Sequence, residues 1–270
     1  MFKYQTFLMT LQFVTRLPVS GLLAKEPLVE EDPSIGEKPL AKNALSDWQD
    51  AILYFPAAGL LLGAIYLLSA LLLSTFAGDT LLHSALIASL VTVLMIWLSG
   101  GLHIDGLADM TDAWVGGLGD QQRTLDIMKD PTCGPMAVMA VVLSVLVRFV
   151  ACWLIIDQGS WLLLLLAPAL ARCSGLAFYR QGHYLRKQGM GSAFVTVAKS
   201  DIAGKVLCGS LGIGSVLLIG YWPGLLAAFL AFYFLRQTSD QRLGGFTGDV
   251  AGASIELTEV ALLAFGILFI

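Results

Sequence analysis

Long apolar runs dominate the chain, and most of them are long enough to cross a membrane. A spanning helix needs about 20 mostly apolar residues. The polar residues fall between the runs rather than along one side of each run, so the pattern differs from that of amphipathic surface helices. We expect four clear spans, at Ala51–Phe76, Thr80–Ser99, Met136–Ile156 and Trp161–Phe178. Three shorter and less certain spans follow, at Val206–Gly220, Tyr221–Leu235 and about 253–270.

The composition supports the same interpretation. Residues of the set AVILMFWYC make up 57% of the chain and charged residues only 13%, whereas soluble domains are nearer half apolar and a quarter charged. This excludes a cytosolic globule, a basic nucleic-acid-binding domain and a disordered chain. We predict an all-α, polytopic transmembrane bundle of about six to seven spans. It forms one domain over 1–270, with an N-terminal segment (1–50) before the bundle (51–270).

The N-terminal segment does not resemble a cleaved signal peptide. Gln5, Gln12 and Arg16 interrupt its apolar residues, so an amphipathic segment at the membrane surface or a short first span fits better. Gly21–Asp50, rich in prolines and acids, is interpreted as a polar loop. The four cysteines form no CxxC pair and are interpreted as small apolar residues: Cys133, Cys152, Cys173 and Cys208.

Basic residues lie in every second connection between the runs. Under the positive-inside rule these connections face the cytoplasm, and so does the N-terminus. Nearly all carboxylates lie on the same side, so we expect the polar chemistry on the cytoplasmic face, in loops and helix ends. The connections with Lys or Arg are 1–50, 100–135, 179–205 and 236–256, and those without are the turns around Asp79, Asp157 and Trp222.

Three aspartates share one predicted helix face after the second long run. Asp105, Asp109 and Asp112 are spaced i, i+4, i+7 within Gly100–Gly117, which places them within an arc of about 60° at about 100° per residue. Such carboxylates repel one another unless a cation lies between them, and Mg²⁺ takes one or two carboxylates plus phosphate oxygens and water. The sequence therefore predicts a Mg²⁺ site; the alternative is a solvated acidic helix face.

Two cations follow these acids. Arg123 and Lys129 are the only basic residues of this connection, and both side chains bind phosphate well. Carboxylates for a metal with Arg and Lys for phosphate are typical of phosphoryl transfer. Ordinary helix ion pairs that involve Asp126 and Asp130 are the alternative.

A second acidic group opens the last apolar run. Asp249, Glu256 and Glu259 share about 80° of a helix face. Nearby glycines could let backbone N–H groups approach a phosphate at the helix N-terminus: Gly244, Gly245 and Gly248.

Three further residues have two open interpretations. Arg148 and Arg172 lie inside predicted spans, where each forms either a structural ion pair or a contact with substrate phosphate. His103 is either a metal or substrate ligand or a hydrogen-bonded structural residue. His83 and His183 lack metal-ligand spacing.

These motifs together are similar to one family. GGLHIDGLADMTDAWVGG at 100–117 and GGFTGDVAGASIE at 244–256, with FVTRLPV at 13–19 and YFPAAGLLLGA at 54–64, closely resemble cobalamin synthase, the adenosylcobinamide-GDP ribazoletransferase family. The likeness extends over nearly the whole chain. The Gly21–Asp50 loop is longer than is usual in the family.

The resemblance implies a multi-pass enzyme of the bacterial inner membrane with its active site facing the cytoplasm. It implies that the enzyme is Mg²⁺-dependent, joins α-ribazole or its 5′-phosphate to adenosylcobinamide-GDP, and releases GMP. On this basis Asp105, Asp109 and Asp112 hold Mg²⁺, Arg123 and Lys129 neutralise the leaving GMP, and Asp249 orients the attacking hydroxyl. We expect substrate contacts from His103, Asp126, Asp130, Arg172, Gly244, Gly245, Gly248 and Glu256.

Two other classes of protein compete with this interpretation. A CDP-alcohol phosphotransferase-like enzyme also sets aspartates on cytoplasmic helix ends, but its DxxDGxxAR order is absent. A cation transporter would need acids at mid-membrane depth with exits on both sides. The partners expected are the two substrates and membrane lipid, with no nucleic acid; an oligomer and association with other cobalamin-pathway enzymes stay open.

Overall fold

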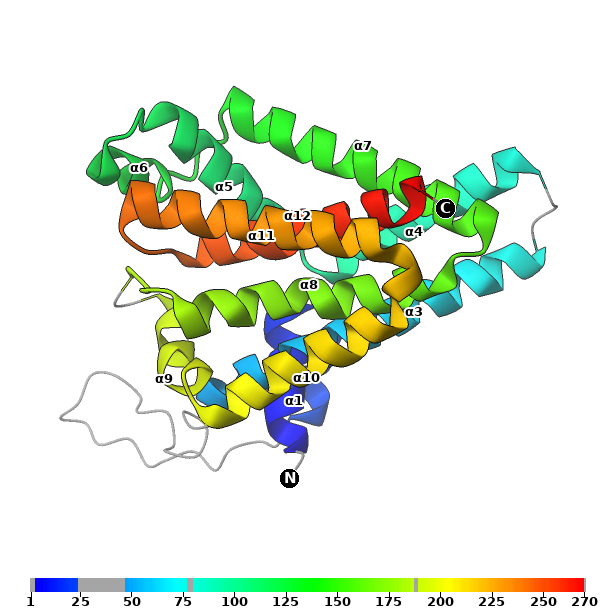
Figure 1. Cartoon of the computed structure of the whole chain (residues 1–270), viewed down its shortest axis with the longest axis horizontal. Helices are drawn as coiled ribbons and strands as arrows, with labels where there is room; N and C mark the ends of the chain where they lie inside the picture. The colour runs from blue at the N-terminus through cyan, green and yellow to red at the C-terminus, as the bar shows by residue number, and fades with distance from the viewer. Residues whose placement is uncertain (1–2, 24–46, 77–79, 187–188, 270) are drawn as a thin grey trace.

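The structure is a computed structural model that describes residues 3–23, 47–76, 80–186 and 189–269. In this part of the chain all regular elements are helices, and the one strand-like contact is an isolated bridge between Tyr184 and Phe246. The all-α prediction is confirmed (Figure 1). The helices are α1 (Tyr4–Val14), α3 (Phe55–Phe76), α4 (Leu81–Leu98), α5 (Leu102–Gly116), α6 (Gln121–Ile127), α7 (Pro135–Gln158), α8 (Trp161–Gln181), α9 (Phe194–Ala198), α10 (Asp201–Leu217), α11 (Trp222–Leu243) and α12 (Gly248–Leu268), with short 3-10 turns η1 (Ser20–Leu22), η2 (Ala51–Tyr54), η3 (Met190–Ala193) and η4 (Ile219–Tyr221).

Six helices within the described ranges are long and apolar enough to cross a membrane. A seventh candidate is broken, because Gly191–Ala198 and Asp201–Leu217 meet at 89°. The polytopic bundle of six to seven spans is therefore confirmed. The ends of the last three predicted spans were wrong: α10 begins at Asp201, α11 runs to Leu243 and α12 begins at Gly248. Apolar runs mark only the part of a helix that would lie within the membrane, and these helices continue into polar residues at one end.

The N-terminal helix α1 does not span. Its 11 residues cover about 16 Å at about 1.5 Å per residue, roughly half of the hydrocarbon core. It packs Leu8 and Leu11 into the core, and Lys3 Nζ lies 2.7 Å from Asp50 Oδ2. Of the two N-terminal alternatives, the structure therefore has the amphipathic segment. Most of the predicted loop Gly21–Asp50, and Asp79, lie outside the described residues.

The spans run roughly side by side along the long axis of the molecule, with α11 lying over α12 in the middle of the view, α7 above them, and α8 and α10 below (Figure 1). One end of the bundle gathers α5, α6, α9, the start of α7 and the start of α12. In the described residues the opposite end holds the α7–α8 turn, the turn between α10 and α11, and the end of α12. The polar residues of α5, α6 and the start of α12 thus lie at the same end.

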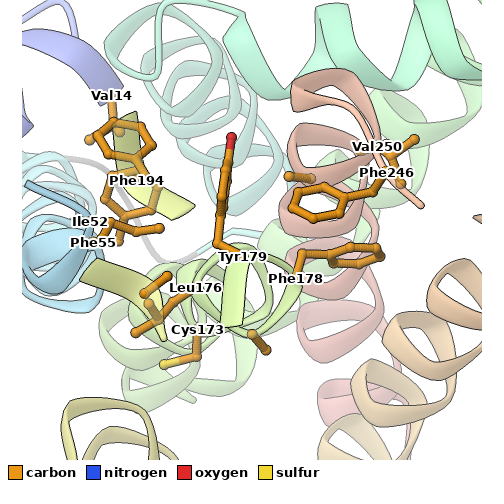
Figure 2. Close-up of a cluster of buried hydrophobic side chains, with 14 of the residues drawn as sticks. Val14, Ile52, Phe55, Cys173, Leu176, Phe178, Tyr179, Phe194, Phe246 and Val250 are labelled. Atoms are coloured by element: carbon orange, nitrogen blue, oxygen red, sulfur yellow. The ribbon is translucent and has the colours of Figure 1, made fainter. Parts of the chain in front are cut away.

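Aromatic side chains fill the core at this end. Tyr179 projects from α8 between Phe194 on one side and Phe246 on the other (Figure 2). Its ring lies 5.7 Å from the Phe194 ring and 5.0 Å from the Phe246 ring, nearly perpendicular to both. This edge-to-face packing is favourable for aromatic rings, and it joins α8, α9 and the segment before α12.

Candidate active site

Helix α5 carries the first acidic group. The α4–α5 turn passes through Gly100 and Gly101, with φ of 68° and 72°, a left-handed conformation that favours glycine. Asp105 lies in the first turn of α5, where a carboxylate interacts favourably with the helix dipole. Asp105 is exposed and Asp109 half-buried on the same side of the helix.

Close packing brings Asp249 to this helix face. At Gly106 of α5, a Cβ atom would lie 2.6 Å from the Asp249 backbone oxygen, so only glycine allows α12 to come this near. Burial raises the pKa of Asp109 to about 6, and the neighbouring charges of Asp105 and Asp249 contribute to that rise. The structure therefore brings the carboxylates of Asp105 and Asp109 on α5 together with that of Asp249 on α12. The nearby charge of Arg186 acts in the opposite direction and lowers the pKa of Asp109.

That arginine had no role in the sequence-based prediction of the site. Arg186 Nη2 lies 2.8 Å from Asp249 Oδ2 and donates to the Met128 carbonyl at 3.2 Å. Backbone bonds hold its segment in place: Leu185 N donates to Phe246 O at 3.0 Å, and Phe246 N to His183 O at 2.9 Å. The only sequence signal was its position in the basic connection 179–205.

Arg186, Asp249 and Asp105 border a pocket of about 160 Å³. Four of the predicted site residues line it: His103, Asp105, Gly248 and Asp249. The residues that sequence reasoning missed are Arg186 and an aromatic set, Phe13, Phe55, Tyr179 and Tyr184. They come from α1, α3, α8 and the segment after α8, so no local pattern joined them.

Asp112 has a different neighbourhood from Asp105 and Asp109. Its carboxylate accepts hydrogen bonds from the backbone N–H groups of Gly134 and Ala137, the latter at 2.8 Å. It thereby satisfies the first turn of α7, whose N–H groups lack helical partners. Among the described residues no group of three or more His, Cys, Asp or Glu side chains is arranged to hold one metal ion. A ligand set of all three α5 aspartates does not form in this arrangement.

The residues of α6 and its following loop lie at a separate, shallow hollow. Arg123, Asp126 and Asp130 line it, and it shares no lining residue with the pocket. Lys129 Nζ lies 3.6 Å from Asp126 Oδ1, with both side chains exposed. Hydrogen bonds from Thr132 lower the pKa of Asp130. The structure thus shows a surface ion pair here and does not bring Arg123 into the pocket.

The two intramembrane arginines form buried ion pairs. Arg148 Nη2 lies 2.8 Å from Glu256 Oε2, and Arg172 Nη1 lies 3.4 Å from Glu259 Oε2. Ser144 Oγ donates to Glu256 Oε1 at 2.6 Å. Neither Arg172 nor Glu256 lines the pocket. Of the two interpretations of these arginines, the structure therefore shows the ion pair, and the substrate contacts expected of Arg172 and Glu256 stay predictions.

His103 and two glycines have mainly structural surroundings. His103 is only 5% exposed, and burial together with Arg172 and Arg148 holds its pKa well below the usual range. Gly244 ends α11 with φ of 67°. A Cβ on Gly245 would lie 2.3 Å from His183 O. Of the three predicted phosphate-loop glycines, only Gly248 lines the pocket.

The fold and the site define a polytopic membrane protein with a pocket at one end of its spans that is lined by Asp105, Asp249 and Arg186. Residues 6–267 match the family model described as cobalamin-5-phosphate synthase, so the chain belongs to this family. The resemblance seen in the motifs is confirmed.

Curated relatives named adenosylcobinamide-GDP ribazoletransferase are similar over most of their length. The protein from Pseudomonas entomophila is 44% identical over 79% of this chain and 85% of the relative. That from Pseudomonas putida strain GB-1 is 42% identical over 95% and 96%, and that from Pseudomonas aeruginosa 41% over 96% of each. No solved structure matches the chain.

Proposed function

We propose that this protein is an adenosylcobinamide-GDP ribazoletransferase that joins α-ribazole, or its 5′-phosphate, to adenosylcobinamide-GDP and releases GMP. The observation that carries the proposal is the similarity to relatives of that name across 96% of both chains. The charged groups of the pocket add support, since transfer between phosphate esters needs groups that hold phosphate oxygens and manage one proton.

The reaction is a displacement at phosphorus. A hydroxyl oxygen of α-ribazole forms a new bond to the phosphorus next to cobinamide, the bond from that phosphorus to the oxygen of GMP breaks, and the hydroxyl proton leaves. Asp249 lines the pocket and is the residue we assign to orient this hydroxyl and accept its proton. The Arg186 guanidinium beside it, at 2.8 Å, would contact phosphate oxygens once substrate separates the pair.

The residues fit a Mg²⁺ ion that arrives with substrate phosphates. Mg²⁺ in phosphate sites uses one or two carboxylates, and Asp105 and Asp109 supply two on one helix face. Burial, followed by the charges of Asp105 and Asp249, raises the pKa of Asp109 to about 6, and a bound cation would favour its ionised form. When bound, Mg²⁺ would neutralise the pyrophosphate. Asp112 acts mainly through the α5–α7 contact that positions this face.

The connection 120–134 would form the outer part of the site. The Met128 carbonyl accepts a hydrogen bond from Arg186 at 3.2 Å. Lys129 is the residue that follows Met128 in the chain. We assign Lys129 to the charge of the leaving GMP, and Arg123, exposed on α6 outside the pocket, to a weaker contribution at longer range. Asp126 and Asp130 hold this loop through bonds to Lys129 and Thr132.

The pocket end of the bundle would face the cytoplasm from the inner membrane. The connections at this end carry the basic residues, while the turns at the other end, after α7 and α10, contain no Lys or Arg. This is the distribution that the positive-inside rule associates with a cytoplasmic face.

An assay on purified membranes tests the proposed function. Membranes with the expressed protein, adenosylcobinamide-GDP, α-ribazole and Mg²⁺ should yield GMP and the joined product by mass spectrometry. Omitting either substrate should stop both products together. GMP released without α-ribazole would identify a hydrolase instead.

A further inference from the structure

The lining of the pocket falls into two chemical groups. The charged lining comprises Asp105, Arg186 and Asp249, and the aromatic lining comprises Phe13, Phe55, Tyr179 and Tyr184. The reaction at phosphorus uses only the charged lining. The four rings also pack against the core, and each presents part of its surface to the pocket, where a ligand would contact it.

The aromatic rings are held in fixed positions. The Tyr179 and Tyr184 rings lie 5.4 Å apart, and the Phe13 and Phe55 rings 6.3 Å apart in a stacked arrangement. Glycine at 191 makes room for both tyrosines, because a Cβ there would lie 2.0 Å from the Tyr179 hydroxyl. Tyr179 stands between neighbouring rings (Figure 2). A rigid aromatic surface binds a planar ring with little loss of side-chain freedom.

The size of the pocket selects a single ring system. Its volume is about 160 Å³, and an apolar protein cavity of roughly 150 Å³ holds a benzene molecule. One flat heterocycle fits if part of it reaches the mouth. A corrin macrocycle does not fit, so the cobinamide part of the larger substrate stays outside.

The polarity of the lining decides which heterocyclic ring of the two substrates fits the pocket, guanine or benzimidazole. Guanine has several donors and acceptors on its edge, and each one left unpaired in a dry site weakens binding. The two hydroxyls of the aromatic lining, on Tyr179 and Tyr184, lie close against Gly191, so this lining offers guanine few partners. A benzimidazole ring is mostly carbon and makes few such demands, so it suits this lining better.

We propose that the aromatic lining is the subsite for the benzimidazole base of α-ribazole, with the ribose directed toward Asp249 and Arg186. The inference rests on the proposed function. It explains how a hydroxyl of the smaller substrate reaches the charged lining, while the pyrophosphate approaches from the mouth.

Steady-state kinetics of Phe13→Leu, with each substrate varied in turn, test this subsite. Base stacking on an aromatic side chain gives about a tenfold effect on affinity, so KM for α-ribazole should rise about tenfold and KM for adenosylcobinamide-GDP less than twofold. Phe13→Tyr, which keeps the ring, should restore KM. Phe229→Leu is the matched control, because Phe229 is 61% exposed on α11 and does not line this pocket.

A second variant narrows the pocket without removing core packing. At Gly248 the nearest atom to an added Cβ is the Tyr184 hydroxyl at 3.9 Å, so Gly248→Val should fold and exclude the base. Free benzimidazole should inhibit the wild-type enzyme competitively against α-ribazole, and about tenfold less in Gly248→Val. Guanosine should show no such difference.

The outcomes separate this subsite from the proposed function. A rise in KM for adenosylcobinamide-GDP alone would place guanine in the pocket and overturn the inference. So would unchanged KM values in both Phe13→Leu and Gly248→Val. A wild-type protein that forms no product from the two substrates would instead refute the proposed function.

Discussion

The Arg186 guanidinium lies 2.8 Å from the Asp249 carboxylate, and both side chains line the same pocket. Each is partly exposed, at 30% and 20% of the side chain, so a phosphate can reach the arginine from the pocket. The pair places a cation and a candidate base side by side. Five predictions test this arrangement and its surroundings.

Arg186→Lys should lower kcat/KM by at least about tenfold, because a point charge cannot reproduce the planar fork that holds Asp249 and phosphate. Arg123→Lys should cost only a few-fold, since Arg123 is exposed on α6 outside the pocket. The membrane assay with both variants at equal abundance measures this. A larger loss from Arg123→Lys would move the phosphate site to α6.

Asp105→Asn and Asp109→Asn should each reduce product formation about a hundredfold or more at normal protein abundance. Each variant keeps the size of the side chain and removes a charge that a hard cation needs. Asp157→Asn is the control, because Asp157 is exposed at the opposite end of the bundle. Equal effects of Asp109→Asn and Asp157→Asn would mean that only net charge matters.

The raised pKa of Asp109 predicts a pH-dependent stability in the absence of added divalent metal. The folded protein binds this proton with a pKa of about 6, above the roughly 3.9 of an unfolded chain. The ionised carboxylate therefore destabilises the fold above about pH 6, and the penalty disappears as the pH falls toward 4. Asp109→Asn should raise Tm by about 1 to 4 °C at pH 7.5 and by only about a third of that at pH 4.5. Thermal unfolding in detergent measures both, and an equal shift at the two pH values would contradict the prediction.

Arg148→Leu should destabilise the protein by about 3–5 kcal/mol, because it leaves the Glu256 charge buried without its partner. The double variant Arg148→Leu/Glu256→Leu should recover much of that loss, since no unpaired charge remains. Abundance and Tm of the detergent-solubilised protein report stability. A double variant that is stable but has a much higher KM for a phosphate substrate would show that Arg148 contacts substrate.

Single cysteines should report the orientation in a variant without its own cysteines. A cysteine at Gln122 or Gln241, both exposed at the pocket end, should be protected from an impermeant thiol reagent in intact cells. A cysteine at Gln158, exposed at the other end, should react. Labelling of Gln122→Cys from outside would reverse the orientation.

The sequence alone determined the class of fold, because lipid imposes one simple condition. Every backbone polar group inside the hydrocarbon must be satisfied within the segment, so long apolar runs can only be helices and their number can be read directly. The acidic face of α5 was also predictable, since the spacing of Asp105 and Asp109 is a property of one helix. The paired glycine-rich motifs were enough to indicate the family, because they are short stretches of contiguous residues.

Only the tertiary structure decided which residues meet. Local periodicity describes relations within one helix and says nothing of partners from distant segments. The ion pair of Arg186 with Asp249, the pairing of Arg172 with Glu259 and the bonds from Asp112 to α7 all depend on how helices pack. The same holds for the aromatic lining, whose rings come from α1, α3, α8 and the segment that follows α8. Close backbone contact, as at Gly106 against Asp249, sets these distances, and that contact exists only in the folded bundle.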